Sequence, residues 1–399
     1  MTTATAGFAP RSGEGWRDPF GMYRELRDHD PVHHVARGDY WVLSRYADVF
    51  RAVRDTATFS SAQGLTFEYD ELGRAGLREV APMVFLDPPD HTEFRRLVAA
   101  GFTPRHVESI EPDVRRFVAT RVERLCAAGS GDVVAELLKP LPSFVVAHYL
   151  GVPPEDRVRF DGWTEGIVAA NALGDPLLAA DTVGELFTYF TSLIERRRDD
   201  PGDDVVSELV HVGDGAGVSP LRILGFAFTM VTGGNDTSTG LLGGGLELLA
   251  GDPAQRDLLV DDPGLIPVAV EELLRLTAPV QGLARTTTVD VDLDGGTIPT
   301  GRKVLLLYAS ANRDEREFGA DAAALDVRRN PRQILTFGYG AHHCLGAAAA
   351  RLMGRVALEE VLRACPRFTV DAGAGRYAPG HFVRRYESLP FVADASVDG

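Results

Sequence analysis

The chain has 399 residues, 45% of them hydrophobic, which is enough to bury a large core. Its formal net charge of -16 argues against a broad nucleic-acid-binding surface, because such affinity comes mostly from cations that neutralise phosphates. The three cysteines, Cys126, Cys344 and Cys365, include no C-x-x-C pair. They indicate a reducing, cytoplasmic environment rather than a disulfide framework.

The first residues, MTTATAGFAPRSGEG, contain neither the apolar core of a signal peptide nor an anchor-length apolar run. We expect a flexible arm over residues 1–15. No internal repeat or low-complexity linker divides the remainder, so residues 16–399 are predicted to form a single helix-rich domain.

Two segments carry the pattern of short strands. Residues 31–53 predict two strands about a turn at Gly38-Asp39 and then a helix. Residues 288–308 repeat the strand pattern about Gly295-Gly296. The predicted fold class is therefore mainly α with small β-sheets.

The longest predicted helix begins at Ser219-Pro220, a capping residue followed by proline in the first turn, and ends near Gly251. Roughly thirty residues of helix span about 45 Å. Between residues 223 and 246 the only charge is Asp236, so a membrane span is an alternative. A buried central helix of a large α domain is favoured, because the rest of the chain has the composition of an ordinary soluble protein.

The segment TFGYGAHHCLGAAAAR, residues 336–351, places glycines and histidines around one cysteine. The glycines allow a flat, bulky group to approach the backbone, and the helix expected after Leu345 would stabilise a thiolate at Cys344. A buried cysteine acting as a small hydrophobe is one alternative. A zinc site of His342, His343 and Cys344 is another, disfavoured because adjacent ligands rarely share one tetrahedral ion.

This segment resembles the haem-binding loop of the cytochrome P-450 family, F-G-x-G-x-H-x-C-x-G. The matching residues are Phe337, Gly338, Gly340, His342, Cys344 and Gly346. The resemblance implies heme b, iron protoporphyrin IX, with Cys344 as its axial thiolate and metal ligand. It also implies the family's single-domain fold, a triangular prism with a long central helix over the haem.

Further segments match the family in the right order. VEELLR places Glu272 and Arg275 on one helix face, with Arg329 as a third member, and the resemblance makes this set structural. In GGNDTS, Gly233 would border the oxygen site, and Asp236 and Thr237 would be the catalytic pair that relays protons.

The resemblance also implies a set of haem-propionate partners. His91 and Arg95 lie one helical turn apart in DHTEFRR, Arg285 follows in QGLART, and His342 comes from the cysteine loop. Buried carboxylates would be costly without such donors. Phe337, Gly338 and Gly346 complete the cofactor-binding set.

By family position, a largely apolar substrate pocket is expected. Its predicted lining residues are Leu65, Phe67, Met83, Val84, Phe85, Ile167, Leu173, Met230, Gly233, Val280 and Leu283.

The implied function is that of a monooxygenase that activates dioxygen and hydroxylates or epoxidises a small apolar molecule, in a tailoring step of secondary metabolism. No flavin or iron-sulfur motif is visible, so the electrons are expected from an external ferredoxin and ferredoxin reductase. Candidates for a basic docking patch are Arg96, Arg105, Arg351 and Arg355, which could equally be ordinary surface residues.

Two other functions stay open: a peroxide-dependent haem-thiolate enzyme, which the Asp-Thr pair disfavours, and a haem-binding sensor without turnover. The protein is expected to be a monomer that binds neither nucleic acid nor membrane.

Overall fold

The computed structural model describes residues 7–74, 81–173, 180–212 and 217–393. Its helices are α1 (Phe20–His29), α2 (Tyr46–Arg54), α3 (Glu71–Arg74), α4 (Asp90–Val98), α5 (Pro104–Ser109), α6 (Glu111–Ala128), α7 (Pro140–Tyr149), α8 (Arg157–Leu173), α9 (Ala180–Asp199), α10 (Val205–His211), α11 (Pro220–Gly251), α12 (Pro253–Asp261), α13 (Ile266–Thr277), α14 (Tyr308–Ala311), α15 (Glu315–Phe318) and α16 (Ala347–Ala364). The strands are β1 (Val32–Val35), β2 (Tyr40–Leu43), β3 (Phe59–Ser60), β4 (Ser130–Asp132), β5 (Leu283–Thr287), β6 (Val291–Leu293), β7 (Gly296–Ile298), β8 (Lys303–Leu306), β9 (Phe368–Val370), β10 (Arg376–Tyr377), β11 (Tyr386–Ser388) and β12 (Pro390–Ala393).

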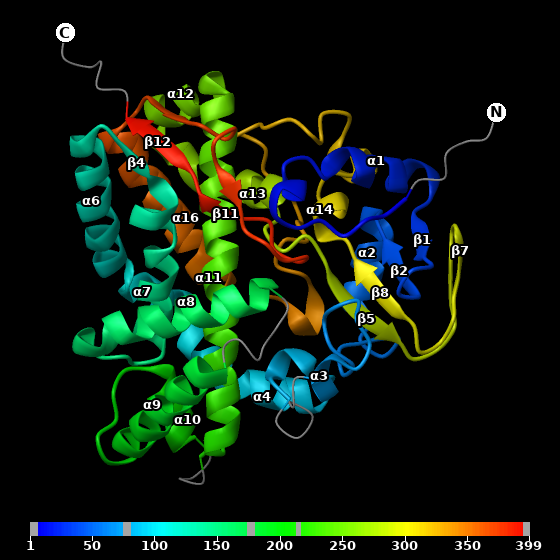
Figure 1. The fold of residues 1–399 in the computed structure, drawn as a ribbon, viewed down its shortest axis with the longest axis horizontal. Helices are drawn as coiled ribbons and strands as arrows, with labels where there is room; N and C mark the ends of the chain where they lie inside the picture. Colours follow the sequence, from blue (N-terminus) through cyan, green and yellow to red (C-terminus); the bar gives the residue numbers. More distant parts are fainter. Residues whose placement is uncertain (1–6, 75–80, 174–179, 213–216, 394–399) are drawn as a thin grey trace.

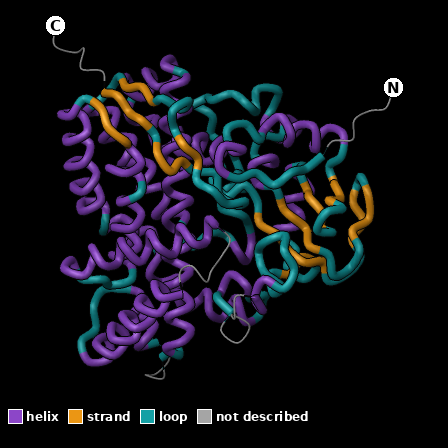
Figure 2. Tube along the Cα trace, in the orientation of Figure 1, coloured by secondary structure: helices purple, strands orange, loops and turns teal. Residues whose placement is uncertain are grey.

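Most helices gather on one side of the molecule, and a sheet in the order β1-β2-β8-β5-β3 lies on the other (Figures 1 and 2). The two predicted strand pairs are present. β1 pairs antiparallel with β2 across the Gly38-Asp39 turn, and β6 pairs with β7 across Gly295. Gly38, Asp39 and Gly295 have positive φ, a conformation that favours glycine and short polar residues.

The long helix α11 runs through the helical part of the molecule (Figure 1) and packs against α7, α8, α9, α13 and α16. It begins as predicted, because the Ser219 hydroxyl accepts a hydrogen bond from the amide of Arg222 and Pro220 occupies the first turn. It is buried on several faces, as expected for a central helix. Within the described ranges, no helix is both long and apolar enough to cross a membrane.

A buried ion-pair cluster joins α13 to the segment before the cysteine loop. Glu272 and Arg275 are both 0% exposed, and two bonds of 2.7 Å connect them. Arg329 reaches Glu272 at 3.1 Å, and Arg275 also donates to the carbonyl of Asn312 at 2.7 Å. The three residues expected as a structural set therefore meet in space.

Replacing Glu272 by glutamine should destabilise the fold by about 3–5 kcal/mol, because it leaves buried Arg275 without its counter-charge. Urea unfolding of the variant would measure the loss. The neighbouring Glu271, which pairs with Arg351 on a partly exposed face, provides the matched control. Its glutamine variant should lose about 0.2–1 kcal/mol, and equal losses in the two variants would contradict the buried cluster's structural role.

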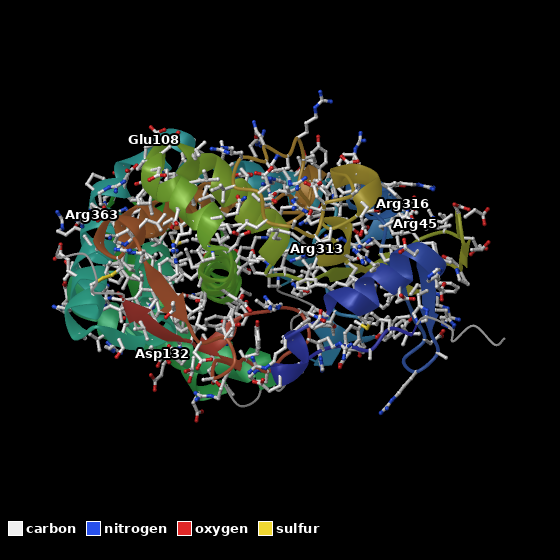
Figure 3. All side chains as sticks on the ribbon, turned by 90° about the horizontal axis from the view of Figure 1, so that it is seen from above. Arg45, Glu108, Asp132, Arg313, Arg316 and Arg363 are labelled. Atoms are coloured by element: carbon white, nitrogen blue, oxygen red, sulfur yellow. A yellow bond between two sulfur atoms is a disulfide. The ribbon has the colours of Figure 1, made fainter. Side chains whose placement is uncertain are left out.

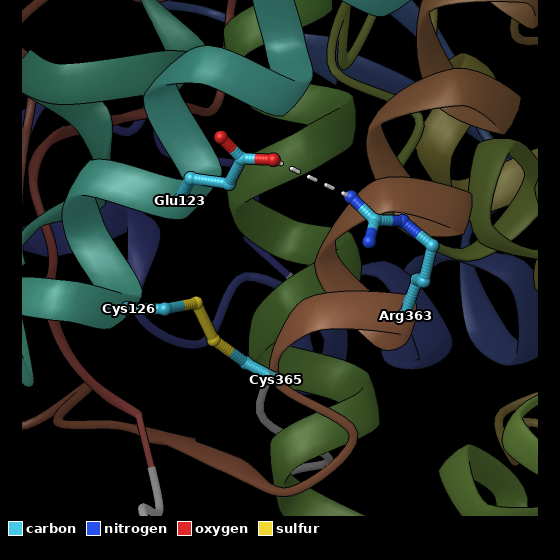
Figure 4. Close-up of a disulfide and its surroundings, with 4 residues drawn as sticks. All are labelled: Glu123, Cys126, Arg363 and Cys365. Atoms are coloured by element: carbon cyan, nitrogen blue, oxygen red, sulfur yellow. Dashed lines mark ion pairs between the residues drawn. A yellow bond between two sulfur atoms is a disulfide. The ribbon is translucent and has the colours of Figure 1, made fainter.

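The two remaining cysteines correct the prediction of a chain without disulfides. Cys126, near the end of α6, and Cys365, just after α16, form a disulfide with their Cα atoms 6.6 Å apart (Figure 4). Glu123 and Arg363 pair across the same two helices at 3.9 Å. The cysteines are 239 residues apart in sequence, so only the packing of α6 against α16 brings them together.

The segment expected as a flexible arm is in contact with the domain from Phe8 onward, while residues 1–6 lie outside the described part. The Trp16 indole donates to the carbonyl of Gly380 at 2.9 Å, and the Gly380 amide donates to the Ser12 hydroxyl at 2.9 Å. Arg384 donates to the Trp16 carbonyl at 2.8 Å. Residues 12–16 thus hold the C-terminal segment, which reaches the candidate site.

Charged side chains in the interior mostly tether main-chain groups. Arg313 lies inside the body of the molecule, while Glu108 and Arg363 lie at its edge (Figure 3). The Arg313 guanidinium donates to the carbonyl of Leu276 at 2.9 Å and covers the ring of Phe20. Burial lowers the pKa of Arg313 to about 9. It joins the end of α13 to α1.

Candidate active site

The cysteine loop precedes α16, as predicted. The Cys344 amide donates to the carbonyl of Phe337 at 2.9 Å, closing a turn in which Gly338 and Gly340 have φ of +64° and +71°. Left-handed backbone at these two positions explains the glycines. The helix starts at Ala347 with Gly346 as its N-cap, so Cys344 lies two residues before the cap.

The Cys344 thiol is free and accessible to solvent, although protein atoms surround it closely enough to raise its pKa by desolvation. The Gly346 amide, Arg95 and Arg351 oppose this shift. The expectation that the protein alone would lower the pKa is therefore not met. A bound metal ion would deprotonate the thiol outright.

Four basic side chains from three elements lie together near this loop. His91 and Arg95 come from α4, Arg285 from β5, and His342 from the turn before Cys344. The rings of His91 and His342 are 4.1 Å apart. Burial, Arg285, His91 and Arg95 together lower the pKa of His342 to about 3. The four predicted propionate partners are thus brought together.

This cluster lacks matching negative charge within the described part of the chain. Arg95 and Arg285 form no salt bridge there, and Arg285 donates only to main-chain and phenolic oxygens. His91 is 1% exposed, and its Nδ1 has no hydrogen-bond partner. Uncompensated guanidinium charges and a buried polar atom without a partner are costly unless an anionic group binds to them.

The chemistry of this donor set fits haem. Two propionates would supply the missing negative charge to His91, Arg95, Arg285 and His342, and the accessible Cys344 thiol would supply the soft ligand that iron takes in this family. The fit rests on the cluster's unbalanced charge and on the exposed sulfur.

The middle of α11 has an unusual surface. Gly233 is exposed although the helix around it is buried, and a Cβ placed on it would meet no atom within 4 Å. The Thr237 hydroxyl donates to the Gly233 carbonyl at 2.9 Å, the back-bond expected for a helical threonine. Open space therefore lies beside the predicted oxygen-activating residues.

Asp236 forms an ion pair with a residue that the sequence analysis missed. Arg385, just before β11, lies 2.6 Å from the Asp236 carboxylate. Burial raises the pKa of Asp236 to about 6, while Arg385 and Lys139 act in the opposite direction. A signal was available, because Arg384 and Arg385 are two adjacent cations that directly follow the apolar pair Phe382-Val383.

The predicted pocket residues differ in how deeply they are buried. Leu65, Phe67, Val84, Phe85, Met230, Val280 and Leu283 are half-buried, as lining residues would be. Met83 and Ile167 are buried and belong to the main hydrophobic core. The side chain of Leu173 lies outside the described residues.

Two of the four arginines considered for partner docking have their charge neutralised. Arg351 pairs with Glu271 at 2.5 Å, and Arg355 pairs with Glu111 and Glu359. Arg96 is exposed, and the side chain of Arg105 lies outside the described residues. A basic patch is therefore weaker than the sequence suggests.

Comparison with known proteins decides the family. The chain is 61% identical over 393 residues to "Cytochrome P450 130" of Mycobacterium tuberculosis, covering 96% of this chain and 97% of that protein. The chain belongs to the cytochrome P450 family. The family model "Cytochrome P450" matches residues 264–373, which include α13 and the cysteine loop.

Other relatives of the P450 chain agree over nearly its whole length. It is 35% identical to the "Vitamin D(3) 25-hydroxylase" of Pseudonocardia autotrophica, covering 98% of this chain and 97% of that one. Cytochrome P450 CYP109Q5 from Chondromyces apiculatus has a TM-score of 0.86 at 32% identity, with 96% of this chain and 97% of that chain covered. The protein is a P450 monooxygenase with the mainly helical single-domain fold, and its cofactor is haem with a cysteine thiolate ligand.

Proposed function

We propose that Cys344 is the axial thiolate and that His91, Arg95, Arg285 and His342 bind the two haem propionates. The observation that carries this proposal is the pair Arg95 and Arg285, which have no matching negative charge in the described residues, beside the unpartnered ring nitrogen of His91 and the free Cys344. Phe337, Gly338 and Gly346 shape the loop around the sulfur. Bound haem supplies the activation of dioxygen.

The chain's own residues then manage protons and water. Asp236 can hold or release a proton near neutral pH, because its pKa lies at about 6. The Thr237 hydroxyl, bonded to the Gly233 carbonyl, presents its oxygen beside the open space at Gly233. Together they form a path for protons from the Arg385 side of α11 to that space.

The substrate is proposed to be a largely apolar small molecule, because the half-buried lining residues are aliphatic and aromatic. The relatives named "Vitamin D(3) 25-hydroxylase" and "Steroid C26-monooxygenase" make vitamin D(3) and steroids the first compounds to test. The reaction is hydroxylation of an unactivated carbon or epoxidation of a carbon–carbon double bond, in secondary metabolism and in the cytoplasm.

A ferredoxin and its reductase are the proposed electron donors. The test incubates the purified protein with NADH, a bacterial ferredoxin and a ferredoxin reductase, and analyses a steroid panel by mass spectrometry. The expected product is heavier by one oxygen atom, and the oxygen comes from labelled dioxygen. Product from hydrogen peroxide alone would favour the peroxide-dependent enzyme, and no product from either source would favour the sensor.

Replacing Arg385 by glutamine should move the pH profile of turnover to higher pH by about one unit. The cation lowers the pKa of Asp236, and loss of one nearby charge shifts a carboxyl by about 1–3 units. At pH 7 the protonated fraction would rise from about one tenth to about one half. Arg376, an exposed residue of β10, is the control. An unmoved profile in R385Q would contradict the coupling.

A further inference from the structure

The segment over residues 61–67 lies beside the site without forming a helix or a strand. Ser61 contacts His342, with 3.3 Å between the hydroxyl oxygen and Nε2. Phe67 packs against Phe382, with ring centroids 5.3 Å apart. The segment therefore touches both the proposed propionate donors and the proposed pocket edge, where Leu65 also lies. Because the segment has no regular secondary structure, its conformation depends on the side chains that bind its main chain.

A long side chain from the sheet reaches this segment. Lys303, the first residue of β8, is 0% exposed. Its ammonium donates to the carbonyl oxygens of Gln63 at 2.7 Å and Gly64 at 3.2 Å. It forms no salt bridge with any carboxylate of the described residues. Both hydrogen bonds of this buried ammonium go to the main chain of one turn.

Glu71 binds the donor groups of the same turn, whereas Lys303 binds its carbonyl oxygens. One Glu71 carboxylate oxygen accepts from the amide and the hydroxyl of Thr66, both at 2.8 Å. Gly64 has φ of +101°, and a Cβ there would collide with that carboxylate. The ammonium thus binds the carbonyls of the turn while the carboxylate binds its N–H group. Together the two side chains fix the orientation of the carbonyl groups and the N–H group of the turn.

Burying an ammonium in this way is costly for the fold. Desolvation lowers the pKa of Lys303 to about 8, with Arg285 acting in the same direction and Glu71 against it. Replacing a buried charged side chain by an apolar one of similar volume often leaves the folded protein equally stable or makes it more stable. The sheet itself therefore does not require a lysine here, whereas the ammonium supplies the donor from which the carbonyls of Gln63 and Gly64 accept.

We propose that Lys303 is a positioning residue that sets the edge of the substrate pocket by holding the turn at Gln63 and Gly64. The statement about the pocket rests on the proposed function, whereas the statement about the turn does not. Other anchors remain without the ammonium, since the Ala284 amide donates to the carbonyl of Leu65 and Tyr69 accepts from the Lys303 amide. Loss of the ammonium should therefore loosen the turn locally.

The test replaces Lys303 by methionine, which keeps the length of the side chain and removes the donor. Arg302→Met is the matched control, because Arg302 lies next to it, carries the same charge and pairs with Asp39 on the exposed side. Hydrogen exchange of the haem-loaded protein is followed in peptides covering residues 61–71. K303M should exchange about tenfold faster there, and R302M should match the parent protein.

Ligand binding gives the second readout, through the Soret shift with imidazole and with 1-dodecylimidazole. K303M should bind the small probe normally and the long apolar probe about tenfold more weakly. Unchanged exchange together with unchanged binding of both probes would overturn the proposal. If the purified protein bound no haem and K303M still exchanged faster, the proposed function would be contradicted, whereas the role of Lys303 in holding the turn would be supported.

A second substitution, Lys303→Gln, keeps an amide donor without the charge. It should give an exchange rate between those of the parent protein and K303M. Loss of the folded protein in both variants, measured by circular dichroism, would also overturn the proposal. It would show that the ammonium supports the sheet and not the turn.

Discussion

Replacing Cys344 by alanine is expected to abolish the long-wavelength Soret band that the reduced, carbon monoxide-bound protein owes to a thiolate ligand. The other two cysteines are joined in a disulfide, so Cys344 is the only free thiol among the described residues. The four proposed propionate-binding side chains, His91, Arg95, Arg285 and His342, would remain. Some haem should therefore still bind, with a different axial ligand and no monooxygenase turnover.

The matched control for this variant is His343→Ala. His343 precedes Cys344 and is half-buried, and its pKa is lowered by burial and by Arg351. A thiolate-ligated haem predicts that H343A keeps the thiolate band. A zinc site shared by the two residues predicts that both variants lose a metal and that neither shows haem, which elemental analysis would detect. The second result would contradict the proposed site.

Features determined by neighbouring residues could be predicted from the sequence. The start of α11 follows from the hydroxyl of Ser219 and the ring of Pro220, which act within one turn. The back-bond of Thr237 likewise involves a carbonyl four residues away. The cysteine loop needs left-handed backbone at Gly338 and Gly340, and only their local conformation decides this. Such signals do not depend on the rest of the fold.

Features that arise from packing between distant segments could not be predicted in this way. The disulfide joins residues 239 positions apart, because α6 and α16 pack side by side. Arg385 reaches Asp236 from a segment much further along the sequence, and Lys303 reaches the Gln63 turn from a strand. Each is an ordinary residue by type. Only the tertiary contact makes it part of the site.

The electrostatic effect of the surroundings on individual side chains could not be predicted from the sequence either. Cys344 was expected to have a lowered pKa because it lies near a helix N-terminus, yet desolvation outweighs the Gly346 amide and raises it. Arg351 was considered for partner docking, but an ion pair with Glu271 neutralises its charge. In both cases the sign of the effect depends on burial and on neighbours from other elements, which a linear pattern does not contain.

Replacing Asp236 by asparagine is expected to lower coupled turnover by about 10²–10⁴, the usual contribution of a positioned acid or base. The carboxyl has a pKa of about 6 and a fixed partner in Arg385, so it can exchange a proton near neutral pH. Asparagine keeps the size of the side chain and cannot ionise. The rate of substrate oxidation per electron consumed measures the loss.

Two further variants separate proton supply from helix packing. Glu247→Gln makes the same change of carboxylate to amide on α11, at a partly exposed residue beside Arg384, and should leave coupling unchanged. Thr237→Ala removes the hydroxyl beside Gly233 and should divert electrons to hydrogen peroxide while substrate still binds. If D236N and E247Q slowed turnover equally, the effect would come from the helix. If T237A kept full coupling, the hydroxyl would have no part in the proton path, and Asp236 would have to act through water alone.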